Sequence, residues 1–180
     1  LALDFGYESL SKKAESYEIC FIPDNDYRGF LKRKVDGLEE KVNGGSFIDK
    51  DGNILGKHEG YPFYTVGQRK GLGIALGVPA FVTKIIPETN TVVLGYEDDL
   101  SATTMRVRDV NIVKYEKLDT TIEALTKIRY KDKGHLSSVT QEGDHAFVTF
   151  HESVQAIAPG QSAVFYEEDD LIGGGFIARD

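Results

Sequence analysis

The sequence has little cysteine and histidine and no long apolar run, and each shortage excludes a class of protein. A single cysteine, Cys20, excludes an intrachain disulfide and any metal site built from several thiolates. The four histidines show no H-x-x-x-H spacing, so we expect no metal site. No apolar run approaches the ~18 residues that a membrane span needs, and no signal peptide is visible.

Basic residues are also in the minority. The 180 residues include 21 Lys and Arg against 29 Asp and Glu, a formal net charge of −8. This excludes a generally basic surface for nucleic acid, but not a local basic patch, because phosphate binding responds to the nearby field. The 41% hydrophobic content is typical of a soluble globular protein. The chain begins with Leu1 rather than Met, so we expect a piece of a longer protein.

The first part of the chain, residues 1–34, predicts two helices and one strand. The helical patterns are Tyr7–Glu15 and Asp26–Lys34, and the apolar run Ile19–Ile22 between them predicts a strand that carries Cys20. Asp24, Asn25 or Asp26 can cap the second helix.

Residues 35–97 are rich in turns and carry two hairpin patterns. Asp51-Gly52 separates the short strands 46–48 and 53–55, and Pro87–Asn90 separates 81–86 from 91–94. We interpret this region as a small α+β central domain.

Residues 98–180 are predicted to be all β, with six short strands separated by Gly, Asp, Asn and Pro. This spacing is typical of a small barrel or sandwich. We predict a mainly β protein whose central domain is followed by a C-terminal antiparallel barrel or sandwich, and the resemblance described below implies the β-barrel. The predicted strands are Met105–Val113, Thr121–Ile128, Leu136–Gln141, His145–Phe150, Ser162–Tyr166 and Leu171–Ala178.

Three features have both a structural and a functional interpretation. Gly67–Gly73 fails the P-loop and dinucleotide templates, and is either a plain turn or a turn whose cations Arg69 and Lys70 meet a nucleic-acid backbone. Cys20 is either a small buried hydrophobe or a reactive thiolate or persulfide at a strand end. Lys127–Lys133 places four cations around Tyr130, which suits either a solvated hairpin end or RNA phosphates and a stacked base.

Several longer strings occur together in one order and resemble the tRNA-specific 2-thiouridylases, which replace the 2-oxygen of the anticodon wobble uridine with sulfur. One departure is Tyr17, where the family commonly has Gln. The matching strings are Ser16-x-x-Ile19-Cys20-Phe21-Ile22-Pro23, Tyr64-Thr65-Val66-Gly67-Gln68-Arg69-Lys70-Gly71-Leu72-Gly73, Ile128-Arg129-Tyr130, Pro159-Gly160-Gln161-Ser162 and Gly173-Gly174-Gly175.

The resemblance implies the C-terminal part of an ATP-dependent tRNA sulfurtransferase that makes 2-thiouridine at U34. The family's N-terminal domain binds ATP with Mg²⁺ through a Ser-Gly-Gly-x-Asp-Ser loop and holds a first catalytic cysteine; neither occurs in these 180 residues. We therefore expect no thiolation by this chain alone. The resemblance divides the chain into a remnant of the catalytic domain with a linker (residues 1–34), a central domain (35–97) and a tRNA-binding barrel (98–180).

The same resemblance assigns roles to individual residues. Cys20 matches the catalytic cysteine that carries sulfur as a persulfide. Arg129, Tyr130 and Gln161 match tRNA contacts. Gln68, Arg69 and Lys70 lie in the family's longest string, and we assign them to RNA contact or loop support.

The expected partners are a tRNA of the Lys, Glu or Gln type with U34 and a sulfur-donor protein, either a cysteine desulfurase or a sulfur relay protein. We expect a cytoplasmic monomer that does not bind membranes. Two alternatives are kept. The chain can be a non-catalytic RNA-binding barrel module in which Cys20 belongs to the core, or a translation-factor-like barrel that binds protein.

Overall fold

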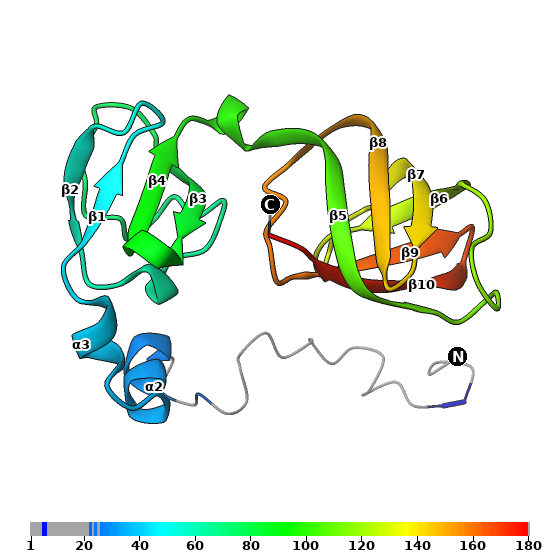
Figure 1. Cartoon of the computed structure of the whole chain (residues 1–180), viewed down its shortest axis with the longest axis horizontal. Coiled ribbons are helices and arrows are strands. Elements are labelled where there is room, and N and C mark those ends of the chain that lie inside the picture. Colours follow the sequence, from blue (N-terminus) through cyan, green and yellow to red (C-terminus); the bar gives the residue numbers. More distant parts are fainter. Residues whose placement is uncertain (1–4, 7–21, 23, 25, 180) are drawn as a thin grey trace. The chain divides into compact units, whose positions relative to one another are not determined.

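The computed structural model describes residues 5–6, 22, 24 and 26–179. The chain divides between Lys41 and Val42 into two units, and the second unit contains two β-sheets (Figure 1). Cys20, the predicted helix Tyr7–Glu15 and all of the predicted strand Ile19–Ile22 except Ile22 lie outside the described residues. Within the described part, no helix has the length and apolar character needed to cross a membrane.

In the described part of the chain, two short helices precede the first sheet. Helix α2 (Tyr27–Lys34) confirms the predicted second helix, and the Asp26 carboxylate caps it by accepting the Gly29 N–H at 2.9 Å. Helix α3 (Leu38–Val42) was not predicted. It has five residues, which is too short for an apolar periodicity to show in the sequence.

The central sheet contains both predicted hairpins. Its order is β2-β1-β4-β3, and the unpredicted parallel pairing of β1 with β4 joins the two hairpins. Phe47, Val82 and Val92 are fully buried and form its core. The elements are β1 (Gly45–Ile48), β2 (Ile54–His58), β3 (Phe81–Ile86) and β4 (Thr91–Gly95), with 3-10 turns η1 (Tyr61–Phe63) and η2 (Pro87–Thr89).

Asn90 connects the turn of the second hairpin to the rest of this sheet. Its backbone has a left-handed φ of 49°, which Asn tolerates better than most residues. Its side-chain Nδ2 donates to the Val42 carbonyl at 2.5 Å, and its Oδ1 accepts the Tyr61 N–H at 3.1 Å. The two hairpins are therefore tied together by one side chain as well as by strand pairing.

The second sheet closes on itself and confirms the predicted antiparallel barrel. Its order is β10-β5-β8-β7-β6-β9. Strands β5 and β8 begin or end several residues beyond the predicted strands, since Ser101 pairs with Gln155 where the sequence shows no clean apolar alternation. The elements are η3 (Glu97–Leu100), β5 (Ser101–Ile112), β6 (Ile122–Lys127), β7 (His135–Glu142), β8 (His145–Gln155), β9 (Ser162–Glu167) and β10 (Asp170–Ile177).

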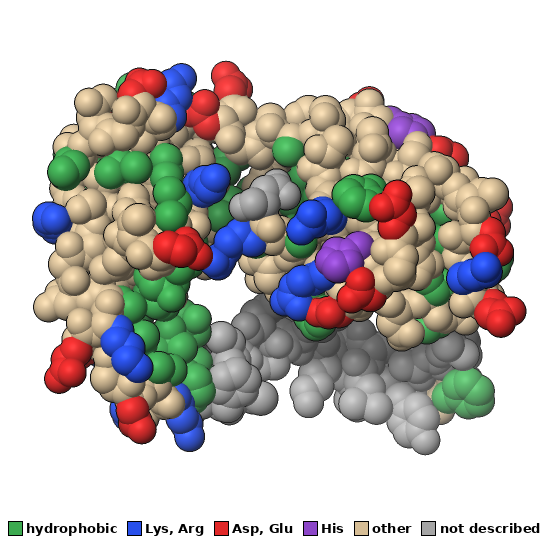
Figure 2. All heavy atoms as spheres, in the orientation of Figure 1, with side chains coloured by type: hydrophobic (Ala, Val, Ile, Leu, Met, Phe, Trp, Pro, Cys, Tyr) green, Lys and Arg blue, Asp and Glu red, His purple; other side chains and the backbone are tan. Residues whose placement is uncertain are grey.

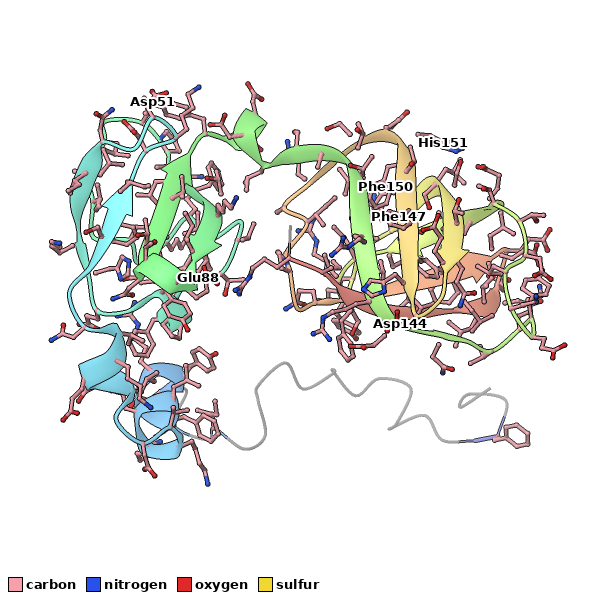
Figure 3. The ribbon with its side chains drawn as sticks, in the orientation of Figure 1. Asp51, Glu88, Asp144, Phe147, Phe150 and His151 are labelled. Carbon is pink, nitrogen blue, oxygen red and sulfur yellow. The ribbon has the colours of Figure 1, made fainter. Side chains whose placement is uncertain are left out.

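Alternating side chains fill the barrel. On β8, Phe150 is 3% exposed within the core, whereas Phe147 is 43% exposed on the outer face (Figure 3). On β10, three successive glycines allow neighbouring strands to approach closely. An ideal Cβ on Gly174 would lie 2.4 Å from the Ala163 carbonyl oxygen, and one on Gly173 would lie 2.4 Å from that of Asn111. The glycine string is therefore a packing requirement of the barrel wall.

Candidate functional site

The loop between β6 and β7, residues 128–134, presents Arg129 and Tyr130 to solvent. Tyr130 is 69% exposed although its loop begins at Ile128, which is buried. The two flanking strands pair with each other from Ile122–Val139 to Thr126–His135. The exposed Tyr130 and its neighbour Arg129 therefore lie in a short loop between two paired strands of the barrel.

Asp132 holds this loop from inside. Its side chain is only 6% exposed. Its Oδ2 accepts the Ile128 N–H at 3.0 Å and its Oδ1 accepts the Gly134 N–H at 3.2 Å. Burial raises the pKa of Asp132, but these two backbone hydrogen bonds and the nearby His135 and Arg129 outweigh it, so the pKa lies below its usual value. An ionised carboxylate therefore fixes both ends of the loop.

The 66–73 loop carries the second group of predicted residues. The Gln68 side chain is used within the loop: its Oε1 accepts the Thr65 N–H at 3.1 Å, and its Nε2 donates to the Lys70 carbonyl at 2.9 Å. The Arg69 guanidinium lies 6.0 Å from the centre of the Phe81 ring. Lys70 is exposed. The two cations are thus available at the surface of a loop that Gln68 shapes.

Gly67 connects that loop to β3 and to the barrel. Its N–H donates to the Val82 carbonyl at 2.8 Å, and Val82 donates back to Gln68 at 2.9 Å. Gly67 has a φ of +86°, and an ideal Cβ there would lie only 2.9 Å from Cβ of Ala156. Both the left-handed backbone and the close approach require glycine.

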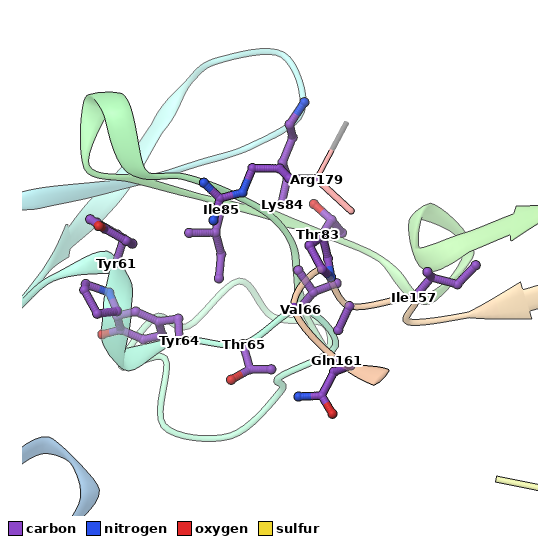
Figure 4. Close-up of a pocket in the computed structure, with 14 residues that line it drawn as sticks. Tyr61, Tyr64, Thr65, Val66, Thr83, Lys84, Ile85, Ile157, Gln161 and Arg179 are labelled. Carbon is purple, nitrogen blue, oxygen red and sulfur yellow. The ribbon is translucent and has the colours of Figure 1, made fainter. Parts of the chain in front are cut away.

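Gln161 lies in a pocket of about 520 Å³ in the second unit (Figure 4). Its side chain is exposed, and its backbone is fixed because its carbonyl accepts the Ile177 N–H at 2.8 Å. Thr65 and Val66, from the start of the 66–73 loop, line the same pocket. The fold therefore brings Gln161 next to the string that contains Gln68–Lys70.

Two family models match the chain, one on each sheet. Residues 29–96 match the tRNA methyl transferase PRC-barrel domain, and residues 102–177 match the aminomethyltransferase beta-barrel domain. The tRNA-specific 2-thiouridylase MnmA of Cytophaga hutchinsonii is 58% identical over 98% of this chain and 48% of its own length. Those of Amoebophilus asiaticus and Salinibacter ruber are 57% and 50% identical, again over 98% of this chain, and over 47% and 46% of their own lengths.

The chain is similar to tRNA-specific 2-thiouridylases along nearly its whole length. It corresponds to a C-terminal part, and it spans about half the length of the curated relatives that it matches. The resemblance found in the sequence strings is therefore confirmed.

The predicted site residues fall in three places. Arg129 and Tyr130 share the β6–β7 loop, Gln68–Lys70 share the 66–73 loop, and Gln161 lies at the pocket. Cys20 lies outside the described residues. In the described part of the chain, no group of three His, Cys, Asp or Glu side chains is placed to hold a metal ion.

Asp132 is the residue that sequence reasoning missed. In the sequence it is one acidic residue among four cations, which gives no sign of burial. The available signal is its position two residues before Gly134 in a tight connection, since Asp often accepts a backbone N–H two residues on.

The molecular surface agrees with a local rather than a general basic site: Figure 2 shows Lys and Arg side chains interspersed with Asp and Glu over the face in view.

Proposed function

We propose that this chain is the tRNA-gripping and sulfur-carrying part of an enzyme that makes 2-thiouridine at position 34 of tRNA. The observation that carries the proposal is 58% identity with a 2-thiouridylase over nearly the whole chain. The exposed Arg129–Tyr130 loop supports it from the structure, because a cation beside an exposed aromatic ring suits an RNA phosphate and an unpaired base.

The grip on tRNA rests on two loops in this proposal. Arg129 contacts a backbone phosphate and Tyr130 stacks on a base, while Asp132 keeps both on the barrel surface. Arg69 and Lys70 supply further phosphate contacts, and Gln68 supports their loop. We divide the chain accordingly into a central domain, residues 35–97, and a tRNA-binding barrel, residues 98–180.

Sulfur transfer is assigned to Cys20. Its persulfide offers a nucleophilic terminal sulfur that forms a bond to C2 of the activated uridine as the activated oxygen leaves. A second thiol of the whole enzyme then breaks the S–S bond, forms a disulfide with Cys20 and leaves sulfur on the base. In an alternative route, the second thiol attacks the Cys20 sulfur first, forms the same disulfide and releases hydrosulfide, which then attacks C2 as the activated oxygen leaves.

Activation of the uridine with ATP and Mg²⁺ is proposed for the whole protein only. The 180 residues contain no Ser-Gly-Gly-x-Asp-Ser string, so we assign no ATP contact to them and expect no thiolation from them alone. Sulfur would reach Cys20 from a cysteine desulfurase or a relay protein. We place the reaction in the cytoplasm, carried out by a monomer.

The experiment for the sulfur role uses Cys20→Ser in the whole protein, expressed in cells that lack the native gene. We expect mass spectrometry of tRNA nucleosides to show loss of 2-thiouridine derivatives at unchanged protein level. Purified Cys20→Ser protein should bind tRNA like the wild type. Retained 2-thiouridine would contradict the role of Cys20 and leave a non-catalytic RNA-binding module.

The experiment for the grip measures affinity for an unmodified tRNA of the Lys type across a salt series. Tyr130→Ala should weaken binding roughly five- to 150-fold, as loss of one stacked base does. Arg129→Gln should also flatten the dependence of affinity on salt by about one phosphate contact. Absence of tRNA binding by the wild type at low salt would favour a protein-binding barrel instead.

A further inference from the structure

The pocket that contains Gln161 also contains two cations that no sequence string pointed to. Lys84 comes from β3 of the central sheet, and Arg179 follows β10 of the barrel. Figure 4 shows Lys84 and Arg179 on one side of the pocket, with Thr65 and Gln161 on the other. The volume of about 520 Å³ is within the usual range for a small-molecule site, roughly 300–1,000 Å³.

Irregular backbone on both sides builds this pocket. Strand β3 has a register shift between Val82 and Lys84, so the successive residues Thr83, Lys84 and Ile85 all line the pocket, where a regular strand would turn alternate side chains away. On the barrel side, Ala156 has a left-handed φ of 57° immediately before the lining segment 157–161. Such departures are costly for non-glycine residues and concentrate at functional sites.

The charges in the pocket are only weakly neutralised. Among the residues that the structure describes, Lys84 has no acidic partner, and Arg179 has only Glu88, at 4.0 Å between its Nη1 and Oε1. Both members of that pair are more than half exposed, so their attraction is small. The remaining polar side chains that line the pocket are mostly uncharged, including Thr65, Thr83 and Gln161.

We propose that this pocket binds one nucleotide of the tRNA, with the phosphate on Lys84 and Arg179. Two cations from different elements suit a phosphate dianion or diester, and Gln161 offers both a donor and an acceptor to the sugar or base. Tyr61 and Tyr64 give the pocket an aromatic wall beside the cations. This inference rests on the proposed function, and it extends the tRNA surface from the barrel to β3.

The test measures affinity of the whole protein for unmodified tRNA of the Lys type over a salt series. Lys84→Gln and Arg179→Gln should each weaken binding about three- to tenfold near 0.1 M salt and lower the salt slope by about 1. The double variant should lose less than the product of the two losses, because the cations share one phosphate. Lys50→Gln is the matched control: it makes the same charge change on the same sheet, at an exposed turn outside the pocket, and should leave affinity unchanged.

A fourth variant should change affinity in the opposite direction. Glu88→Gln removes the only acidic partner of Arg179 among the described residues and should strengthen binding about two- to threefold. Uridine monophosphate should shift the backbone amide NMR signals of Thr83, Lys84 and Gln161 in the wild type, and Lys84→Gln should reduce those shifts. Because these side chains are exposed or line an open pocket, melting temperatures should not change.

The outcomes separate this inference from the proposed function. If Tyr130→Ala weakens tRNA binding while Lys84→Gln and Arg179→Gln match Lys50→Gln, the pocket proposal is overturned and the grip by the β6–β7 loop stands. Uridine monophosphate shifts without any effect of Lys84→Gln on tRNA affinity would also overturn it. If the wild type binds no tRNA, the proposed function itself fails.

Discussion

The β6–β7 loop and the 66–73 loop both carry exposed cations, but they are held in different ways. In the first, a buried carboxylate, Asp132, organises the backbone beside the exposed Arg129 and Tyr130. In the second, an amide within the cationic string, Gln68, shapes the backbone beside Arg69 and Lys70. The side chain that supports the backbone is therefore buried in the β6–β7 loop, whereas in the 66–73 loop it is partly exposed and directly precedes the two cations.

This difference affects how mutations are to be read. If Arg129 variants bind tRNA more weakly, the loss reflects a missing contact with tRNA, because Asp132 rather than Arg129 supports the loop backbone. A loss in Gln68 variants reports on loop shape first. Stability and binding must therefore be measured together, and the comparison can be tested at each supporting residue.

The largest expected effect is that of Asp132→Ala. The substitution leaves the Ile128 and Gly134 N–H groups without their acceptor at partly buried positions. We expect a loss of about 2–4 kcal/mol in the free energy of unfolding, measured by urea denaturation. Tyr130→Ala is the control in the same loop and should cost less than about 0.5 kcal/mol. Equal losses in the two variants would contradict a supporting role for Asp132.

The next effect concerns the attachment of the 66–73 loop to the barrel. Gly67→Ala adds a Cβ at 2.9 Å from Ala156, whereas Gly71→Ala adds one whose nearest neighbour is Gln68 Nε2 at 3.9 Å. Both glycines have positive φ, +86° and +75°. Gly71→Ala should therefore cost about 1 kcal/mol from backbone strain alone, and Gly67→Ala about 2–3 kcal/mol, by thermal or urea unfolding. Matching losses would show that the contact with Ala156 does not constrain Gly67.

A smaller effect is expected for Gln68→Ala. It removes two hydrogen bonds in an exposed loop where water can replace the lost partners. We expect a loss of about 0.5–1 kcal/mol in stability, together with weaker tRNA binding because Arg69 and Lys70 lose their fixed positions. Gln68→Glu, which keeps the acceptor for the Thr65 N–H, should restore part of the stability. A variant with full tRNA affinity would leave no supporting role for Gln68 in binding.

The smallest effect appears only in acid. Because folding lowers the pKa of Asp132 below its usual 3.8, its contribution is fully present above that pH and disappears as the pH falls through the folded value. Burial of His58 lowers its pKa below 6.5, so His58 reduces stability from about pH 6.5 downward in all variants. The difference in unfolding free energy between wild type and Asp132→Asn should therefore shrink as the pH falls below 4. A constant difference down to pH 2 would contradict this assignment.

Alternating apolar residues and turn residues predicted both hairpins and a C-terminal barrel or sandwich, and the resemblance to the 2-thiouridylases selected the barrel. The sequence did not predict the β1–β4 pairing, since a parallel contact between residues some 45 positions apart has no local pattern. Helix α3 was missed for the opposite reason, because five residues are too few to show a period.

The candidate site was only partly predictable. Exposed cations and Tyr130 are recognisable from composition, and the family strings located Gln161. The roles of Asp132, Lys84 and Arg179 depend on burial, on a strand irregularity and on two distant segments meeting. Burial, strand irregularity and contact between distant segments cannot be predicted from the spacing of residues along the sequence.

The closure of the barrel also bears on self-association. Exposed strand edges recruit further strands, and a closed barrel offers none. In the central sheet, the edge of β3 is partly occupied by hydrogen bonds between Val82 and residues 67–68. Among the described strands this leaves β2 as the edge at which another chain can add, and Lys57 on that strand is the kind of charged residue that discourages such addition. Association by strand pairing should therefore depend on five residues, Ile54–His58, rather than on the larger, closed sheet.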